Sequence, residues 1–229
     1  MEEIAVSTRL TVRQTDRLRR GAETGDWRAH LPVLAGADVV LREVQVSDAA
    51  SLVSLLTTPE ITRFISRPPS TVDGFERFIV SSQQMRESGE GACFAVTLRG
   101  YDTAIGLFQV RNVSTASAAR QIGGSMDTAE WGFAIGSPFW GSGVFEQCAP
   151  LVIGFAFDYM KVHRLEARAA VQNGRGGRAL RKMGAVAEGV MRKALMCGDE
   201  YLDQVLYAIL ADEWRRRGQE HRSAHTPVH

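Results

Sequence analysis

The stretch Phe139-Trp140-Gly141-Ser142-Gly143-Val144-Phe145 is the most informative part of this chain. It follows an apolar, strand-like run at residues 130–135 and precedes an amphipathic pattern typical of a helix. Glycine lets the backbone turn tightly and approach a ligand closely. The first N–H groups of a helix lack internal partners and carry partial positive charge, so such a loop favours phosphate. A plain strand-to-helix turn stays an alternative, because the third glycine of a dinucleotide fingerprint and the lysine of a P-loop are both missing.

The composition is that of an ordinary globular protein. The chain has 229 residues, of which 45% are hydrophobic and 23% charged, and its formal net charge is +1. This length suits one domain with extensions, and the near-neutral charge gives no sign of a nucleic-acid or membrane partner. No apolar run approaches the roughly 20 residues of a membrane span, and the acidic start lacks a signal-peptide core. We therefore expect a cytoplasmic protein.

The cysteines and histidines do not suggest a metal site or a disulfide framework. Cys93, Cys148 and Cys197 are scattered without metal-ligand spacing, so we expect three packed interior thiols in a reducing compartment. The histidines form no pair with metal-ligand spacing on an expected element. We expect no bound metal.

The first half of the chain combines helical and strand patterns. Residues 1–36 are polar and Arg-rich, and we expect a partly helical arm that docks through Trp27. Ser47 is a suitable N-cap for a helix that follows the first strand. Residues 113–128 have no periodicity and predict a long surface loop. The other expected elements are a strand at 38–44, a short helix at 59–65, a long helix at 72–89, and a hairpin of strands at 92–98 and 104–110.

The second half adds a helix with an apolar stripe from Val144, a strand at 165–171, a short helix between Asn173 and Gly184, and a hairpin at 186–196 and 202–210. After Asp212 the chain is charged, and we expect a fraying tail. The whole pattern predicts a mixed α/β fold of the α+β type, with a mostly antiparallel sheet of about seven strands flanked by helices. The expected domain covers 37–211, between an arm at 1–36 and a tail at 212–229.

Several motifs occur together in one order. Glu130 begins a strand, Trp140-Gly141-Ser142-Gly143 opens a helix, and residues 163–167 read His-Arg-Leu-Glu-Ala. Asn173 and then Met183-Gly184-Ala185 follow. With these motifs, residues 38–210, about three quarters of the chain, resemble a GNAT-superfamily acyltransferase. They are most similar to the Rim-type protein N-terminal acetyltransferases and their small-amine relatives.

The resemblance implies the GNAT fold, with a central strand splayed from its neighbour, and acetyl-CoA as cosubstrate. It implies that freed backbone groups of the splayed strand pair with the pantetheine arm and that the helix start holds the pyrophosphate. Asn173 would help to hold the cofactor near its thioester, although an ordinary N-cap is the alternative. Phe145 stands where the family often has Ala or Gly. It is compatible with the cofactor site if its ring points into the core, because only its backbone N–H is needed there. The implied cofactor-binding residues are Phe133, Ala134, Ile135, Trp140, Gly141, Ser142, Gly143, Val144, Phe145 and Asn173.

Glu130 is the candidate general base, because acyl transfer needs an unprotonated amine. An ion pair at the strand end is the alternative. A backbone N–H of the same strand would stabilise the oxyanion, and no covalent intermediate is expected. The family's usual proton donors are missing, since Gly176 replaces a Ser and Leu180 replaces a Tyr. The CoA thiolate would then leave unassisted or be protonated by water, and Tyr201 is the alternative guess for a general acid.

The sequence therefore predicts an acetyl-CoA-dependent N-acetyltransferase. The acceptor would be a primary amine, either a protein N-terminal α-amine or a small-molecule amine, that attacks directly. A catalytically idle acyl-CoA-binding sensor or scaffold is the alternative, because the donors are missing. The sequence leaves a homodimer open.

Overall fold

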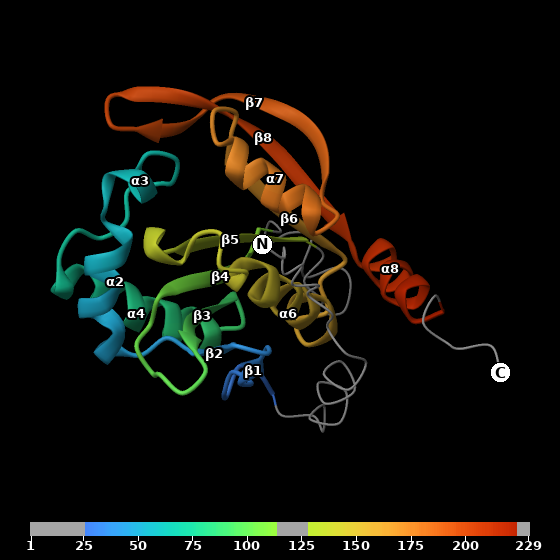
Figure 1. Cartoon of the computed structure of the whole chain (residues 1–229), viewed down its shortest axis with the longest axis horizontal. Coiled ribbons are helices and arrows are strands. Elements are labelled where there is room, and N and C mark those ends of the chain that lie inside the picture. Colours follow the sequence, from blue (N-terminus) through green and yellow to red (C-terminus); the bar gives the residue numbers. More distant parts are fainter. Residues whose placement is uncertain (1–25, 114–127, 224–229) are drawn as a thin grey trace, which may run out of the picture.

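The computed structural model describes residues 26–113 and 128–223, with side chains up to residue 219. Its strands are β1 (Leu34–Ala35), β2 (Val39–Glu43), β3 (Gly91–Leu98), β4 (Gly106–Asn112), β5 (Thr128–Ile135), β6 (Arg164–Ala170), β7 (Val186–Cys197) and β8 (Glu200–Leu210). They form one eight-stranded sheet in the order β1-β2-β3-β4-β5-β6-β8-β7 (Figure 1). The mixed α/β fold class is confirmed, with one strand more than expected.

The helices are η1 (Val46–Asp48), α2 (Ala49–Leu56), α3 (Pro59–Thr62), α4 (Val72–Glu87), η2 (Ser137–Phe139), α6 (Val144–Asp158), α7 (Gly174–Lys182) and α8 (Ala211–Ser223). Apolar side chains of α6 and α7 form one large core with the sheet. Those of α2 and α4 form a second core with other residues of β3 and β4. The sheet therefore lies between two helical layers. None of the helices in these described ranges is long and apolar enough to cross a membrane.

One strand pair gives the sheet its functional shape. All neighbouring strands are antiparallel except β5 and β6, which are parallel. These two pair only at Thr128↔Arg164, Ala129↔Leu165 and Glu130↔Glu166. Beyond Glu130, β5 stays paired with β4, while β6 stays paired with β8. We call the region where the two backbones no longer pair the β5–β6 opening, and it confirms the splayed central strands.

Alternation along β5 assigns its side chains to the two faces. Ala129, Trp131 and Ile135 are buried in the core that includes α6 and α7. Glu130 and Gly132 point to the opposite face, which further along the sheet is covered by α2 and α4. Side chains from this one strand therefore reach both faces of the sheet.

The start of the described chain docks as expected through Trp27. Its side chain is 7% exposed, and its ring lies edge-on to Phe155 of α6 with centroids 6.0 Å apart. Leu34, 1% exposed, begins the short edge strand β1. The proposed helical part of the arm and most of the loop 113–128 lie outside the described residues.

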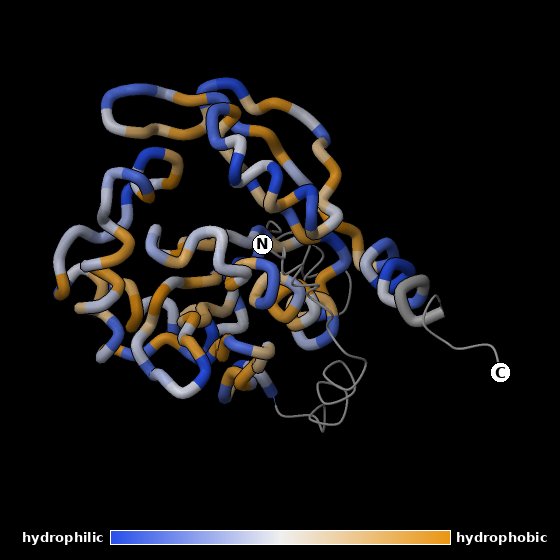
Figure 2. The backbone as a smooth tube through the Cα atoms, in the orientation of Figure 1, coloured by the Kyte–Doolittle hydropathy of each residue, from blue (hydrophilic) through white to orange (hydrophobic). Residues whose placement is uncertain are grey.

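Two local predictions are wrong. Ser47 lies within η1 and caps no helix, because Asp48 organises this turn: its carboxylate accepts the Gln45 N–H at 2.8 Å and pairs with Arg42. The segment after Asp212 begins a helix and does not fray there. Helix α8 is largely hydrophilic (Figure 2), but its Trp214 packs against Phe157, with centroids 6.4 Å apart.

Smaller differences concern α3 and the thiols. The helix expected at 59–65 ends at Thr62. Cys93 and Cys148 are buried as expected, and burial raises the pKa of each thiol to about 12. Cys197 is only half-buried, near the tip of the β7–β8 hairpin, where its Sγ contacts the Arg63 carbonyl at 3.0 Å. The hairpin tip therefore reaches back to the segment after α3 (Figure 1).

Candidate active site

Glu130 lies at the vertex of the β5–β6 opening, in the last rung that joins the two strands. Its side chain is 22% exposed, and its Oε2 is 3.8 Å from Nη2 of Arg168. This separation is beyond hydrogen-bond distance, so the ion pair is loose. Glu130 is therefore reachable from solvent and retains carboxylate oxygens for another partner.

Glu166, the residue opposite Glu130, has a different environment. It accepts a hydrogen bond from Nε of Arg164 at 2.8 Å. Arg164 also binds Glu188 through two further nitrogens, one at 2.9 Å. The hydrogen bond to Glu188 raises the pKa of Arg164, and the same bond lowers the pKa of Glu188. Of the carboxylates at the vertex, Glu130 is the less constrained.

The glycine loop has the geometry of an anion cradle. Gly141 and Gly143 have φ of 78° and 82°, a region that other residues rarely adopt. Gly143 is the N-cap of α6 and supplies no capping side chain. A Cβ built on either glycine would point into open space, with no heavy atom within 4 Å beyond the adjoining backbone. The first N–H groups of α6, from Val144 and Phe145 onward, are therefore available to an anionic ligand.

Trp140 ties the glycine loop to its surroundings. Its indole Nε1 donates to the Ile135 carbonyl at 2.7 Å, while Ser142 Oγ donates to the Phe139 carbonyl at 2.7 Å. The register with β4 directs the backbone groups of Ala134 toward Leu107, contrary to the sequence prediction, and those of Phe133 toward the opening. Because the Ile135 carbonyl is already engaged, the backbone of Phe133 is the freer part of β5. The guanidinium of Arg175 lies over the Trp140 ring, 4.0 Å from its centroid. This contact brings a cation from α7 beside the loop.

Asn173 caps α7, since its Oδ1 accepts the Gly176 N–H at 2.8 Å. The N-cap alternative is thus realised, and the amide Nδ2 remains for a further contact. A Cβ at position 176 would lie 2.7 Å from this Nδ2. A serine at position 176 would therefore require the Asn173 side chain to move. The present position of the Asn173 cap depends on the glycine that replaces the family's serine.

The remaining sequence candidates are spread over the fold. Phe145 packs its ring against Phe133 and Phe108, with centroids 4.6 and 6.2 Å apart, as its fit required. Leu180 is 2% exposed and belongs to the core. Tyr201 is 60% exposed in the β7–β8 hairpin. No proton donor emerges from these positions.

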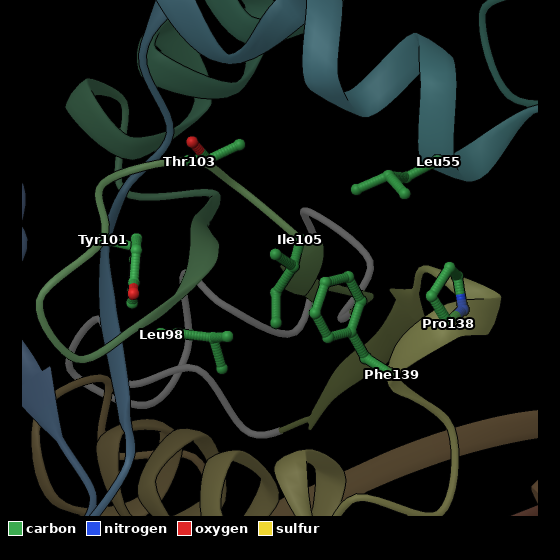
Figure 3. Close-up of a pocket in the computed structure, with 7 residues that line it drawn as sticks. All are labelled: Leu55, Leu98, Tyr101, Thr103, Ile105, Pro138 and Phe139. Atoms are coloured by element: carbon green, nitrogen blue, oxygen red, sulfur yellow. The ribbon is translucent and has the colours of Figure 1, made fainter.

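Sequence reasoning missed two arginines and one cavity. Arg168 and Arg175 carry no motif of their own, and only the register of β5 with β6 and the packing of α7 reveal their places. The cavity, of about 300 Å³, lies between the β3–β4 turn, α2 and η2 (Figure 3). It contains none of the predicted site residues, and its lining is mostly apolar: Leu55, Leu98, Tyr101, Thr103, Ile105, Pro138 and Phe139.

The model of the acetyltransferase (GNAT) domain matches residues 38–186. The chain belongs to the GNAT acetyltransferase family. The matched region includes the β5–β6 opening, the glycine loop and Asn173. This GNAT protein is therefore an acetyltransferase by family, and its family uses acetyl-CoA.

Individual relatives agree with the family. Probable N-acetyltransferase YjcK of Bacillus subtilis is 27% identical over 183 residues, which cover 78% of this chain and 97% of YjcK. The ribosomal protein uS5-alanine N-acetyltransferase of Escherichia coli is 24% identical over 102 residues, covering 44% of this chain and 53% of that enzyme. The structure of Mycobacterium smegmatis RimJ in complex with CoA-disulfide superposes with a TM-score of 0.68 at 20% identity, covering 80% and 90% of the two chains. The Rim-type resemblance is thus supported.

Proposed function

We propose that the protein transfers the acetyl group of acetyl-CoA to a primary amine, either a protein N-terminal α-amine or a small-molecule amine, by direct attack. The observation that carries this proposal is the position of Glu130 at the vertex of the β5–β6 opening, partly exposed and only loosely paired. The similarity to the uS5-alanine N-acetyltransferase supports a protein N-terminus as one candidate acceptor.

The cosubstrate would lie across the opening. Backbone N–H groups of the glycine loop and the start of α6 would bind its pyrophosphate, and Arg175 would add a positive charge. Unpaired backbone groups of Phe133 would bind a pantetheine amide. Asn173 would contribute its free amide nitrogen.

The reaction would run without a covalent enzyme intermediate. The amine nitrogen attacks the thioester carbonyl carbon, and Glu130 takes the proton that the nitrogen loses. A backbone N–H of β5 stabilises the oxyanion until the C–S bond breaks. The thiolate of CoA leaves and takes a proton from water, which fits the glycine at position 176 and the buried leucine at position 180.

Release of free CoA in the presence of a panel of amines tests the proposal, with mass spectrometry to identify the acetylated product. We expect Glu130→Gln to lower kcat by about 100-fold or more while CoA binding persists, since a general base contributes roughly 10²–10⁴-fold. Glu188→Gln is the control, because this carboxylate lies outside the proposed site and pairs with Arg164.

The idle sensor predicts a different result. It would bind acetyl-CoA, turn over no amine, and respond to Glu130→Gln with no change in any measured rate. That outcome would show that the protein binds acetyl-CoA without acting as an enzyme.

A further inference from the structure

Arg168 lies on β6, on the side of the β5–β6 opening across from Glu130. The last rung joins Glu130 to Glu166, so Arg168 lies two residues beyond the vertex on β6. Its neighbours Ala167 and Ala169 are buried in the α6–α7 core, so alternation directs Arg168 to the same face as Glu130. The 3.8 Å separation of their side chains agrees with this placement.

The guanidinium of Arg168 retains unused donors. Arg164, on the same face, satisfies its nitrogens with Glu166 and Glu188. Arg168 is 35% exposed, and within the described ranges its one ionic partner is Glu130, which is beyond hydrogen-bond distance. A guanidinium presents several N–H donors in a planar fork that matches carboxylate and carbonyl oxygens.

Open space lies opposite Arg168. Gly132 is two residues beyond the vertex on β5 and shares the face of Glu130. It is exposed, and a Cβ built on it meets no heavy atom within 4 Å. An amine that reaches Glu130 from this face therefore passes between Gly132, which has no side chain, and the guanidinium of Arg168.

We infer that Arg168 selects acceptors whose amine is followed by an oxygen acceptor on the adjoining carbon, as in an amino acid or a peptide N-terminus. The guanidinium binds the carboxylate or carbonyl oxygen while the amine contacts Glu130. The same positive charge repels the second ammonium group of a diamine. This inference rests on the proposed function and names the substrate class of that site.

The test compares four acceptors that differ in the group next to the amine: glycine, glycinamide, ethylamine and putrescine. CoA release gives kcat and KM for the unaltered protein and for Arg168→Gln, Arg168→Lys and the control Arg192→Gln, which changes an exposed arginine of β7. We expect Arg168→Gln to lower kcat/KM for glycine or glycinamide by about 10- to 100-fold, mainly through KM, as for loss of a charge-assisted hydrogen bond.

Ethylamine, which has no oxygen, should change less than about 3-fold, and Arg168→Lys should retain part of the selectivity. Whether glycine or glycinamide loses more distinguishes a carboxylate from a peptide carbonyl as the bound group. An equal loss on all four amines would overturn the inference and leave the proposed function intact. If the unaltered protein turned over no amine, the proposed function would fail, and the inference with it.

Discussion

Gly143 combines two requirements at a single residue. Its φ of 82° places it in the left-handed region, and it is the N-cap from which α6 starts. Alanine in this region costs roughly 1–2 kcal/mol. A Cβ built on Gly143 would enter space that is now open, at the residue from which the helix starts. The absence of a Cβ at position 143 therefore favours both the stability of the loop and the access of a ligand to it.

We expect Gly143→Ala to lower the free energy of unfolding by about 1–2 kcal/mol and to weaken CoA binding. Denaturant unfolding and calorimetric titration with CoA measure the two effects. Gly132→Ala is the matched control for stability, because Gly132 has no positive φ and its Cβ would meet open space. Equal loss of stability in both variants would show that the positive φ is not the cause.

The sequence alone pointed to some residues of the candidate site and not to others. Glu130 and the two loop glycines could be proposed from the sequence because their motif sets them on a strand end and a helix start. Arg168 could not, because its role depends on which residue of β5 stands opposite it. Ser47 looked like the better helix cap, yet Asp48 organises the turn through its contacts with Arg42 and the Gln45 N–H. These contacts are local, since Asp48 is three residues from Gln45 and six from Arg42, and the signal that was overlooked is an acidic residue at the third position of the turn.

At the scale of elements, two side-chain contacts that involve charge join α7 to the glycine loop and to α6. Arg175 lies over Trp140, and Lys182 Nζ donates to Glu146 Oε1 at 2.8 Å. Partial burial acts against ionisation of Glu146, but the hydrogen bond and charge of Lys182, together with a backbone hydrogen bond, outweigh it and lower the pKa of Glu146. The contribution of this pair to stability is present above the unfolded pKa and is lost as the pH falls through the lower, folded pKa.

We expect Arg175→Gln to weaken CoA binding by about 3- to 30-fold, because the variant removes a charge and a cation–π contact worth roughly 0.5–2 kcal/mol beside the loop. Lys182→Met is the control, since it removes the charged contact between α7 and α6, which lies further along α7 from the glycine loop. The affinity of each variant is read from titration with CoA. Similar affinities for both variants and the unaltered protein would remove Arg175 from the binding site.

The elements themselves were largely predictable, because periodic apolar positions mark β3, β4, α4 and α6. Helix α8 was missed, since its exposed face is charged and a single aromatic residue, Trp214, anchors it on Phe157. Strand β1 was missed for a similar reason. Two residues have no measurable period, and pairing with β2 alone makes them a strand.

At the scale of the whole molecule, Trp27 connects the segment before β1 to the main core. Its ring meets Phe155, which in turn lies edge-on to Phe94 with centroids 5.0 Å apart. We expect Trp27→Ala to lower the free energy of unfolding by about 3–5 kcal/mol, as for a large buried aromatic residue. Denaturant unfolding measures this loss.

The control for Trp27→Ala is Val33→Ala, a truncation in the same segment at a side chain that is 66% exposed. Its effect should stay within about 0.5 kcal/mol. A loss below about 1 kcal/mol for Trp27→Ala would show that the segment docks by other contacts.

The short seam between β5 and β6 also bears on how the protein unfolds. Three rungs join the strands β1–β5 to the group β6–β8–β7, so backbone pairing across the middle of the sheet is sparse. A ligand that spans the opening adds contacts to both groups at once, as an inserted strand would. At a concentration 100-fold above its dissociation constant, such a ligand raises the free energy of unfolding by about 2.7 kcal/mol. The occupancy of the ligand site and the free energy of unfolding are therefore linked through the same binding equilibrium.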